Sequence, residues 1–228
     1  MKKLILILLP ALVLWTGCHK QDSYTYSGIE AGTISGGVFT SDIGTQMTVV
    51  GNAEKYDVSS SRRVLISYET EPVTDPSRIS INLLGLLDAD ILQPVHARSL
   101  PTDPTGFPLQ VSDAWFSEQY LNILATFDGK EPDLHFFGAS YTANEKNLTF
   151  RLTHDGDKDT VSGNTPLSIF LCIPMEEPAR SFDEYVRTHS LLPIHPIPVL
   201  LQWTARAQDG GPLTLLERKG SYLAPQTN

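Results

Sequence analysis

After its N-terminal segment, the chain is a succession of short stretches in which apolar and polar residues alternate. Residues 147–154, NLTFRLTH, show this pattern most strictly. Successive side chains of a strand point to opposite faces, so the stretch predicts a strand with Leu148, Phe150 and Leu152 facing inward and Arg151 facing outward. Turn residues separate such stretches, and no long helical period occurs among them. The sequence therefore predicts an all-β protein.

A first group of strands is expected within residues 31–98. The stretch GTISGGVFT reads as a single strand in which Gly36 and Gly37 mark a bulge or a tight bend. In residues 78–88, RISINLLGLLD, clean alternation favours a strand that runs into a loop, and a helix over residues 83–92 is the alternative. Several short strands with glycines at their bends predict a small closed barrel.

A boundary is expected at residues 98–112, RSLPTDPTGFPLQVS, because three prolines and a glycine interrupt the strand pattern there. A second group of strands follows, within residues 99–228. Residues 166–175, PLSIFLCIPM, are apolar on both faces, which predicts a central strand. Residues 180–188, RSFDEYVRT, fit one helical turn or two. Alternating strands in this part of the chain predict a β-sandwich.

The N-terminus, MKKLILILLPALVLWTGC, has the organisation of an export signal. Lys2 and Lys3 precede an apolar run of 12 residues, 4–15, that is broken only at Pro10. A helix that spans a bilayer needs about 20 apolar residues, so the run is too short to be one. Its length and its basic start are those of a signal peptide.

Thr16-Gly17-Cys18 then places small residues before a cysteine, as in a bacterial lipobox. Trp15 stands where a lipobox usually has leucine. We expect cleavage after residue 17, a lipid on the Cys18 thiol, and a polar tether over residues 18–30. The alternative is an ordinary signal peptide that leaves Cys18 free.

The chain has two cysteines, Cys18 and Cys172. If Cys18 carries lipid, Cys172 has no disulfide partner. Its apolar surroundings predict a buried, inert thiol, because a reactive cysteine needs a cationic and partly exposed setting.

Charge excludes one class of partner. Loss of residues 1–17 removes Lys2 and Lys3 and leaves 15 basic and 26 acidic side chains, a net charge of −11. Binding of nucleic acid depends on basic residues that neutralise phosphates, so a nucleic-acid partner is not expected.

The best metal candidate is the acidic stretch HDGDKDT, in which Asp155, Asp157 and Asp159 alternate. Carboxylate oxygens suit calcium. However, the stretch lacks the glycine and the glutamate that an EF-hand loop requires at its sixth and twelfth positions. A solvated hairpin loop is therefore the preferred interpretation, and we expect no metal and no cofactor.

Catalytic motifs are missing from the sequence. The six histidines show no metal-binding spacing such as H-E-x-x-H. The stretch around Ser140, GASYT, has threonine where a nucleophile elbow needs its second glycine. No phosphate-binding G-x-x-x-x-G-K-[ST] motif occurs. The chain is therefore not expected to be an enzyme.

The lipobox and four stretches that follow it resemble the NigD-like lipoproteins of Bacteroidetes. The four stretches are GTISGGVFTSDIGTQMTVVG, RRVLISYE, ISINLLGLLDADIL and DAWFSEQYLNILATF. The resemblance implies an OB-type barrel over residues 31–98, a β-sandwich over residues 99–228, and a role in immunity to bacteriocins. It carries over no catalytic residue. In exported proteins of that phylum, Asp159-Thr160-Val161 matches a short O-glycosylation motif, which makes Thr160 a candidate site.

Together these features predict a non-enzymatic lipoprotein, anchored in the outer membrane by its N-terminal lipid, that acts by contact with a protein or ligand. His19 follows the lipid cysteine, and the absence of aspartate there favours the outer membrane. The periplasmic and the outer surface both remain open. The alternative is an accessory surface lipoprotein that binds glycans or peptides through exposed aromatics such as Trp115, Tyr120 or Trp203.

Overall fold

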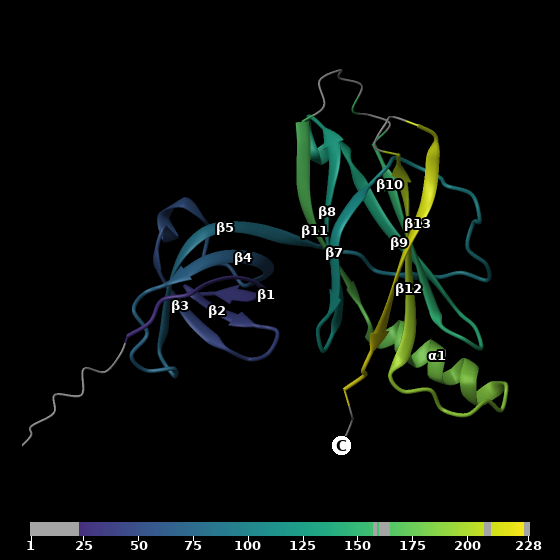
Figure 1. The fold of residues 1–228 in the computed structure, drawn as a ribbon, viewed down its shortest axis with the longest axis horizontal. Helices are drawn as coiled ribbons and strands as arrows, with labels where there is room; N and C mark the ends of the chain where they lie inside the picture. The colour runs from purple at the N-terminus through teal and green to yellow at the C-terminus, as the bar shows by residue number, and fades with distance from the viewer. Residues whose placement is uncertain (1–22, 157–158, 160–164, 208–210, 226–228) are drawn as a thin grey trace, which may run out of the picture.

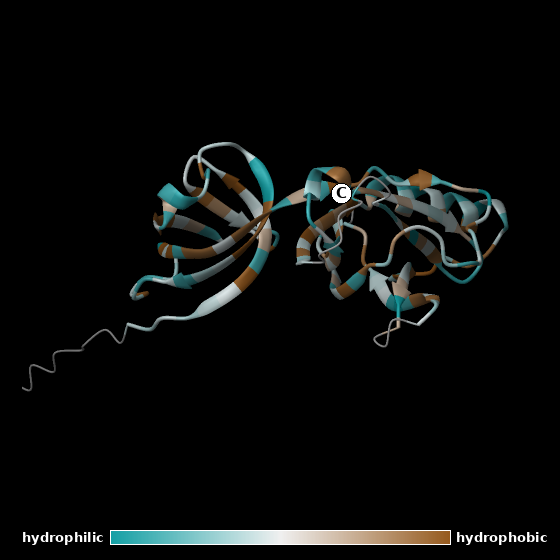
Figure 2. Cartoon of the chain, turned by 90° about the horizontal axis from the view of Figure 1, so that it is seen from above, coloured by the Kyte–Doolittle hydropathy of each residue, from teal (hydrophilic) through white to brown (hydrophobic). Residues whose placement is uncertain are grey.

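The computed structural model describes residues 23–156, 159, 165–207 and 211–225. Within these ranges the chain forms strands β1 to β13, one α-helix and two short 3-10 helices. The predicted all-β class is confirmed. The strands form two bodies, which we call the N-terminal unit (β1–β5) and the C-terminal unit (β6–β13 and α1), and Figure 2 shows them side by side from above.

The N-terminal unit is a closed cycle of five strands. They are β1 (Ser27–Ser35), β2 (Val38–Ser41), β3 (Gln46–Gly51), β4 (Arg62–Thr70) and β5 (Ile79–Ile91), with a 3-10 turn at Ala53–Lys55. Neighbours pair in the order β3-β2-β1-β4-β5, and a parallel pairing of β3 with β5 closes the cycle. Inward-facing apolar residues fill the interior, among them Ile34, Phe39, Val64, Ile66, Ile81 and Leu83.

Gly36 and Gly37 form the turn of the β1–β2 hairpin, so the stretch expected as one bent strand is two strands. Their φ angles are 57° and 79°. A two-residue hairpin turn with both φ angles positive matches the twist of its strands, and glycine adopts it without steric cost.

Strand β5 links the two units. It stays extended to Ile91, so the helix considered for residues 83–92 does not form. Its last part leaves the N-terminal unit and pairs in parallel with β11, where Phe170 lies opposite Ala89 and Cys172 opposite Ile91. Figure 1 shows β5 crossing from one unit to the other.

The C-terminal unit consists of two layers of strands. One layer contains β7 (Gln110–Phe116), β8 (Tyr120–Gly129) and β11 (Thr165–Pro174). The other contains β6 (Val95–His96), β9 (Phe136–Ala143), β10 (Leu148–Asp155), β12 (Ile197–Arg206) and β13 (Leu213–Tyr222). A 3-10 turn at Pro132–Leu134 precedes β9. Buried side chains of both layers form one core, which includes Ile123, Phe127, Phe150, Leu171, Ile197 and Leu201. The finer labels of OB-type barrel and β-sandwich stay predictions.

Helix α1 (Glu176–Thr188) is longer than the one or two turns expected at residues 180–188. Its first turn contains Glu176 and Pro178. Proline is tolerated there and an acidic residue is favoured, because the first backbone N–H groups of a helix have no partner within it. The buried side chains of Phe182 and Val186 hold the helix against the core.

Arg151 corrects the expected orientation of β10. Leu148, Phe150 and Leu152 are buried as predicted, but Arg151 is only 1% exposed. Its guanidinium donates hydrogen bonds to the carbonyl oxygen of Pro101 and to that of Asp103, the latter at 3.4 Å. The outward face of β10 is therefore covered by the connection between β6 and β7.

No helix in the described part of the chain is long and apolar enough to cross a membrane.

Candidate functional site

The two units meet through a small apolar cluster. Ala31 and Leu65 of the N-terminal unit are buried against Phe170 and Cys172 of the C-terminal unit. The ring of Trp115 stacks on Phe170, with centroids 6.0 Å apart and planes at 12°. Burial of apolar surface at this junction stabilises the contact between the units.

Arg63, on β4, is the centre of a hydrogen-bond network beside this cluster, here called the Arg63 network. Its guanidinium donates two hydrogen bonds to the Asp42 carboxylate, both of 2.7 Å, and one of 2.7 Å to Asn122 Oδ1 of the C-terminal unit. Its Nε donates to Cys172 Sγ at 3.1 Å, and the guanidinium carbon lies 4.1 Å from the centre of the Tyr120 ring. One buried cation therefore bonds both units.

The contacts of the Arg63 network stabilise the charged form of Arg63. Burial by itself disfavours the cation, but the contacts with Asp42 and Cys172 raise the pKa of Arg63. Burial raises the pKa of the Cys172 thiol to about 11, despite the opposing effect of Arg63. Cys172 is fully buried in an interior strand, as predicted, and its thiol stays neutral at ordinary pH.

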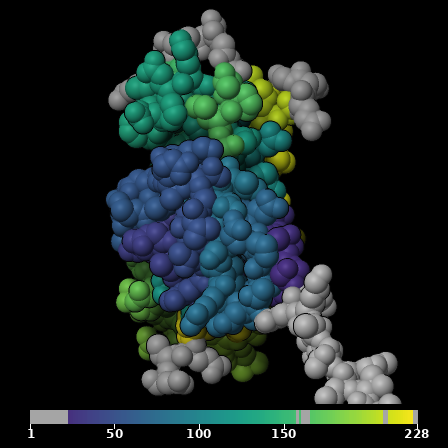
Figure 3. Space-filling model, turned by 90° about the vertical axis from the view of Figure 1, so that its left-hand side faces the viewer, coloured from purple at the N-terminus to yellow at the C-terminus, as the bar shows by residue number. Residues whose placement is uncertain are grey.

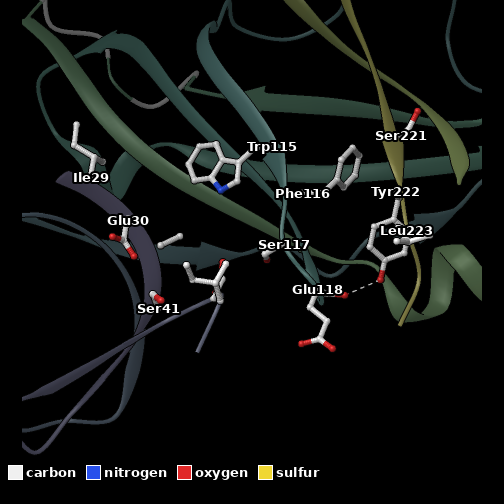
Figure 4. A pocket seen from close by; sticks show the side chains of 13 residues that line it. Ile29, Glu30, Ser41, Trp115, Phe116, Ser117, Glu118, Ser221, Tyr222 and Leu223 are labelled. Atoms are coloured by element: carbon white, nitrogen blue, oxygen red, sulfur yellow. Dashed lines mark hydrogen bonds between the residues drawn. The ribbon is translucent and has the colours of Figure 1, made fainter. Parts of the chain in front are cut away.

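A cleft of about 610 Å³, here called the junction cleft, opens between the two units beside the Arg63 network. Strand β1 and the β2–β3 turn line one side, and the end of β7 and the end of β13 line the other. The lining residues are Ile29, Glu30, Ala31, Ser41, Asp42, Ile43, Trp115, Phe116, Ser117, Glu118, Ser221, Tyr222 and Leu223. Figure 4 shows Ile29 and Glu30 across from Trp115, Phe116 and Tyr222.

Large apolar side chains at the cleft are open to solvent. Ile43 is 87% exposed, Leu223 70% and Ile29 69%. Trp115 and Phe116 are partly buried between them. Exposed apolar side chains that cluster around a concavity mark binding surfaces more often than scattered ones do.

The cleft carries negative charge. Glu30 and Glu118 lie on opposite sides of it, and the Tyr68 hydroxyl donates a 2.5 Å hydrogen bond to Glu30. A polar recess of about 220 Å³ adjoins the cleft and shares Ser41, Asp42, Ser117 and Glu118 with it. Arg63 is the one cation among the residues that line either cavity, and Asp42 pairs with it.

A second polar cluster lies inside the C-terminal unit. His135 Nε2 is 3.1 Å from Asp159 Oδ2, and His135 Nδ1 is 2.8 Å from His154 Nε2. The Asp159 carboxylate also accepts hydrogen bonds from the backbone N–H groups of Lys130 and Glu131. Asp159 thus ties the acidic loop to the β8–β9 connection. The spacing of these histidines in the sequence carries no signal that would reveal the cluster.

Burial and the neighbouring His135 lower the pKa of His154 to about 4, so this imidazole is neutral at ordinary pH. Burial is the larger cause, because it disfavours the charged form.

The residues predicted from sequence are placed as follows. Cys18, Asp157 and Thr160 lie outside the described residues. Asp155 is exposed at the end of β10. Asp159 is held in the histidine cluster. In the ranges that the structure describes, no group of three or more His, Cys, Asp or Glu side chains is arranged to hold a metal ion.

Two of the three aromatics singled out from the sequence lie at the junction. Trp115 lines the cleft and Tyr120 lines the adjoining recess. Trp203 lies elsewhere, in a cavity of about 640 Å³ at one end of the two layers of the C-terminal unit. The sequence drew attention to Trp115 and Tyr120 but offered no way to know that both lie at the junction beside Arg63.

No protein-family model matches the sequence, and no curated protein sequence matches it significantly. Solved structures do match the fold. A NigD-like immunity protein from Bacteroides caccae has a TM-score of 0.58 and 19% identity, over 87% of this chain and 96% of that one. A candidate lipoprotein from Bacteroides fragilis has a TM-score of 0.56 and 12% identity, over 90% of this chain and 100% of that one.

A third structure is a DUF1344 protein of unknown function from Bacteroides vulgatus. It has a TM-score of 0.52 and 14% identity, over 89% of this chain and 92% of that one. Each likeness extends over both units. The chain therefore has the fold of a NigD-like protein, as the resemblance of its sequence predicted.

Proposed function

We propose that the protein is a lipid-anchored, non-enzymatic envelope protein of the NigD-like type, which binds a protein partner at the junction cleft. The observation that carries this proposal is the cleft itself, where Ile29, Ile43 and Leu223 expose apolar surface to solvent at a concave junction. Such exposure reduces solubility unless a partner covers it, which makes binding the simplest reason for it.

The N-terminal unit, which forms one side of the cleft, also lies next to the predicted anchor. The described chain begins at Ser23, and Tyr24 already pairs with Val73 of the N-terminal unit. Ser23 is the fifth residue after Cys18. A fully extended chain of that length reaches about 17 Å, so lipid on Cys18 would hold the N-terminal unit close to the bilayer. Figure 3 views the molecule from the side of the N-terminal unit.

Site-specific photocrosslinking in intact cells tests the binding role. A photoreactive residue replaces Ile43 in the cleft or, as a matched control, Leu192, which is 85% exposed and lies outside the cleft. We expect one discrete adduct from position 43 and none from position 192. Equal adducts at both positions, or none at either, would refute a partner at the cleft.

Immunity to a bacteriocin is the specific role that the resemblance to NigD-like lipoproteins implies, and the similar Bacteroides caccae structure is that of a NigD-like immunity protein. Deletion of the gene should raise sensitivity to a co-occurring bacteriocin, and the wild-type gene should restore resistance. Cys18→Ser should fail to restore it, because the unanchored protein is lost from the membrane. Unchanged sensitivity of the deletion strain would exclude immunity and leave the binding role standing.

A second candidate, a glycan-binding accessory lipoprotein, is supported by the cavity around Trp203. Trp203 is 5% exposed, and its indole N–H has no hydrogen-bond partner among the described residues. Phe127 and Arg206 also line this cavity. A glycan array that gives specific hits, lost in Trp203→Phe, would favour this role, and a blank array would remove it.

A further inference from the structure

We propose that the junction cleft binds a cationic amphipathic peptide segment, whose apolar side chains enter the cleft between the two units and whose basic side chains meet Glu30 and Glu118. This inference rests on the proposed binding role and names the chemistry of the partner.

The apolar part of the segment is required by the cleft lining. Trp115 and Phe116 offer aromatic surface from the C-terminal unit, and Ile29 lies across from them on the N-terminal unit. Ile43 lines the same cleft. A volume of about 610 Å³ lies within the range of sites that hold a small ligand or a few side chains. A folded domain could insert only a protruding segment there, so a peptide segment fits better than a flat protein surface.

The negative charge of the cleft requires the basic part of the segment. Glu30 and Glu118 make no salt bridge with any Lys, Arg or His that the structure describes. Asp42 is neutralised by Arg63, so the net charge of the cleft is that of the two glutamates. The whole chain has a net charge of −9, which attracts cations over a longer range. An anionic ligand would meet like charge at both walls.

The junction is also built to hold its shape. Arg63 binds Asp42 within the N-terminal unit and Asn122 of the C-terminal unit, and β5 runs through both units. A binding surface that is rigid before its partner arrives loses less entropy on binding. The backbone segments that carry Glu30 and Glu118 are therefore held in place before a basic segment binds.

Fluorescence titration in nanodiscs tests the proposal with defined probes. The lipid-anchored protein carries Trp203→Phe, so that Trp115 is the fluorescent tryptophan of the mature chain, and the nanodiscs are zwitterionic phosphatidylcholine. The probe is a synthetic amphipathic peptide of lysine and leucine, compared with its glutamate–leucine counterpart. Empty nanodiscs measure binding to lipid alone. We expect saturable change in Trp115 emission with the lysine peptide and about tenfold weaker binding of the glutamate peptide.

Variants locate the site. Glu118→Gln removes one charge from an exposed side chain that makes no side-chain hydrogen bond to other described residues. This change should weaken binding of the lysine peptide about two- to fivefold. Ile43→Ser should weaken its binding by a similar factor, because apolar contact is lost. The control Glu145→Gln removes an exposed acid outside the cleft and should change nothing. Equal affinity in all three variants, or equal affinity for both peptides, overturns the proposal.

The two proposals fail differently. A specific crosslink from position 43 in cells, with no preference for the lysine peptide, would keep a partner at the cleft and reject its cationic character. Absence of both results would reject the cleft as a binding site.

Discussion

Arg63 of β4 and Asn122 of β8 are joined by a 2.7 Å hydrogen bond that crosses from one unit to the other. The same guanidinium holds Asp42 at the rim of the junction cleft. The bond therefore connects the stability of the junction to the shape of the cleft.

Loss of the Arg63 side chain should loosen the junction. Arg63→Met leaves Asp42 and Asn122 without their donor, and the Arg63 side chain is only 7% exposed. We expect a loss of about 2–4 kcal/mol in the free energy of unfolding. Arg62→Met is the matched control, because Arg62 pairs with the more exposed Asp88 and should cost under about 1 kcal/mol. Urea unfolding measures both, and equal losses would contradict the role given to Arg63.

Stability should depend on pH through His154. Burial lowers the pKa of His154 in the folded protein to about 4, from the ordinary histidine value of 6.5. Between these values the unfolded chain binds a proton that the folded chain does not, so the free energy of unfolding falls as pH drops from 6.5 to 4. The full effect is about 3 kcal/mol.

The comparison of wild type with His154→Gln isolates this contribution. Glutamine cannot titrate, so the variant should lose less stability than wild type between pH 7 and pH 4.5. Urea unfolding at the two pH values gives the difference. Identical losses in the two proteins would show that other groups cause the dependence.

Cys172 should resist alkylation in the native state. A pKa raised from 9.0 to about 11 lowers the thiolate fraction at pH 8 by about 100-fold, and full burial slows access further. The measurement is iodoacetamide labelling of Cys18→Ser, in which Cys172 is the remaining cysteine. Labelling should be slow in buffer and complete in urea. Rapid native labelling would mean that the junction opens readily.

Arg151 should hold the connection between β6 and β7 in place. Arg151→Lys keeps the charge but cannot donate to the carbonyl oxygens of Pro101 and Asp103 in the same geometry. We expect the free energy of local opening at this connection to fall by about 1–2 kcal/mol. The Thr105 amide, which donates to Thr204 Oγ1 at 3.1 Å, should then exchange with solvent about tenfold faster. Arg180→Lys, on the exposed face of α1, is the control and should leave this exchange unchanged.

Alternation of apolar and polar residues predicted strands such as β10, because successive side chains of a strand point to opposite faces whatever lies elsewhere in the chain. Leu148, Phe150 and Leu152 are buried as that period requires. The same local physics made residues 166–175 an interior strand. The resemblance of the lipobox and four strand-rich stretches to NigD-like lipoproteins predicted the fold that the solved structures share.

Tertiary structure decided which polar residues are buried and where a partner can bind. Arg63 and Asn122 are 59 positions apart, and Arg151 and Pro101 are 50 apart. No local pattern predicts such pairings. The sequence around a buried cation does not differ from the sequence around a solvated one, because distant segments of the chain bury it and supply its partners. The junction cleft exists only where β1, β7 and β13 come together, so its apolar rim and its two glutamates could not be read from any one of them.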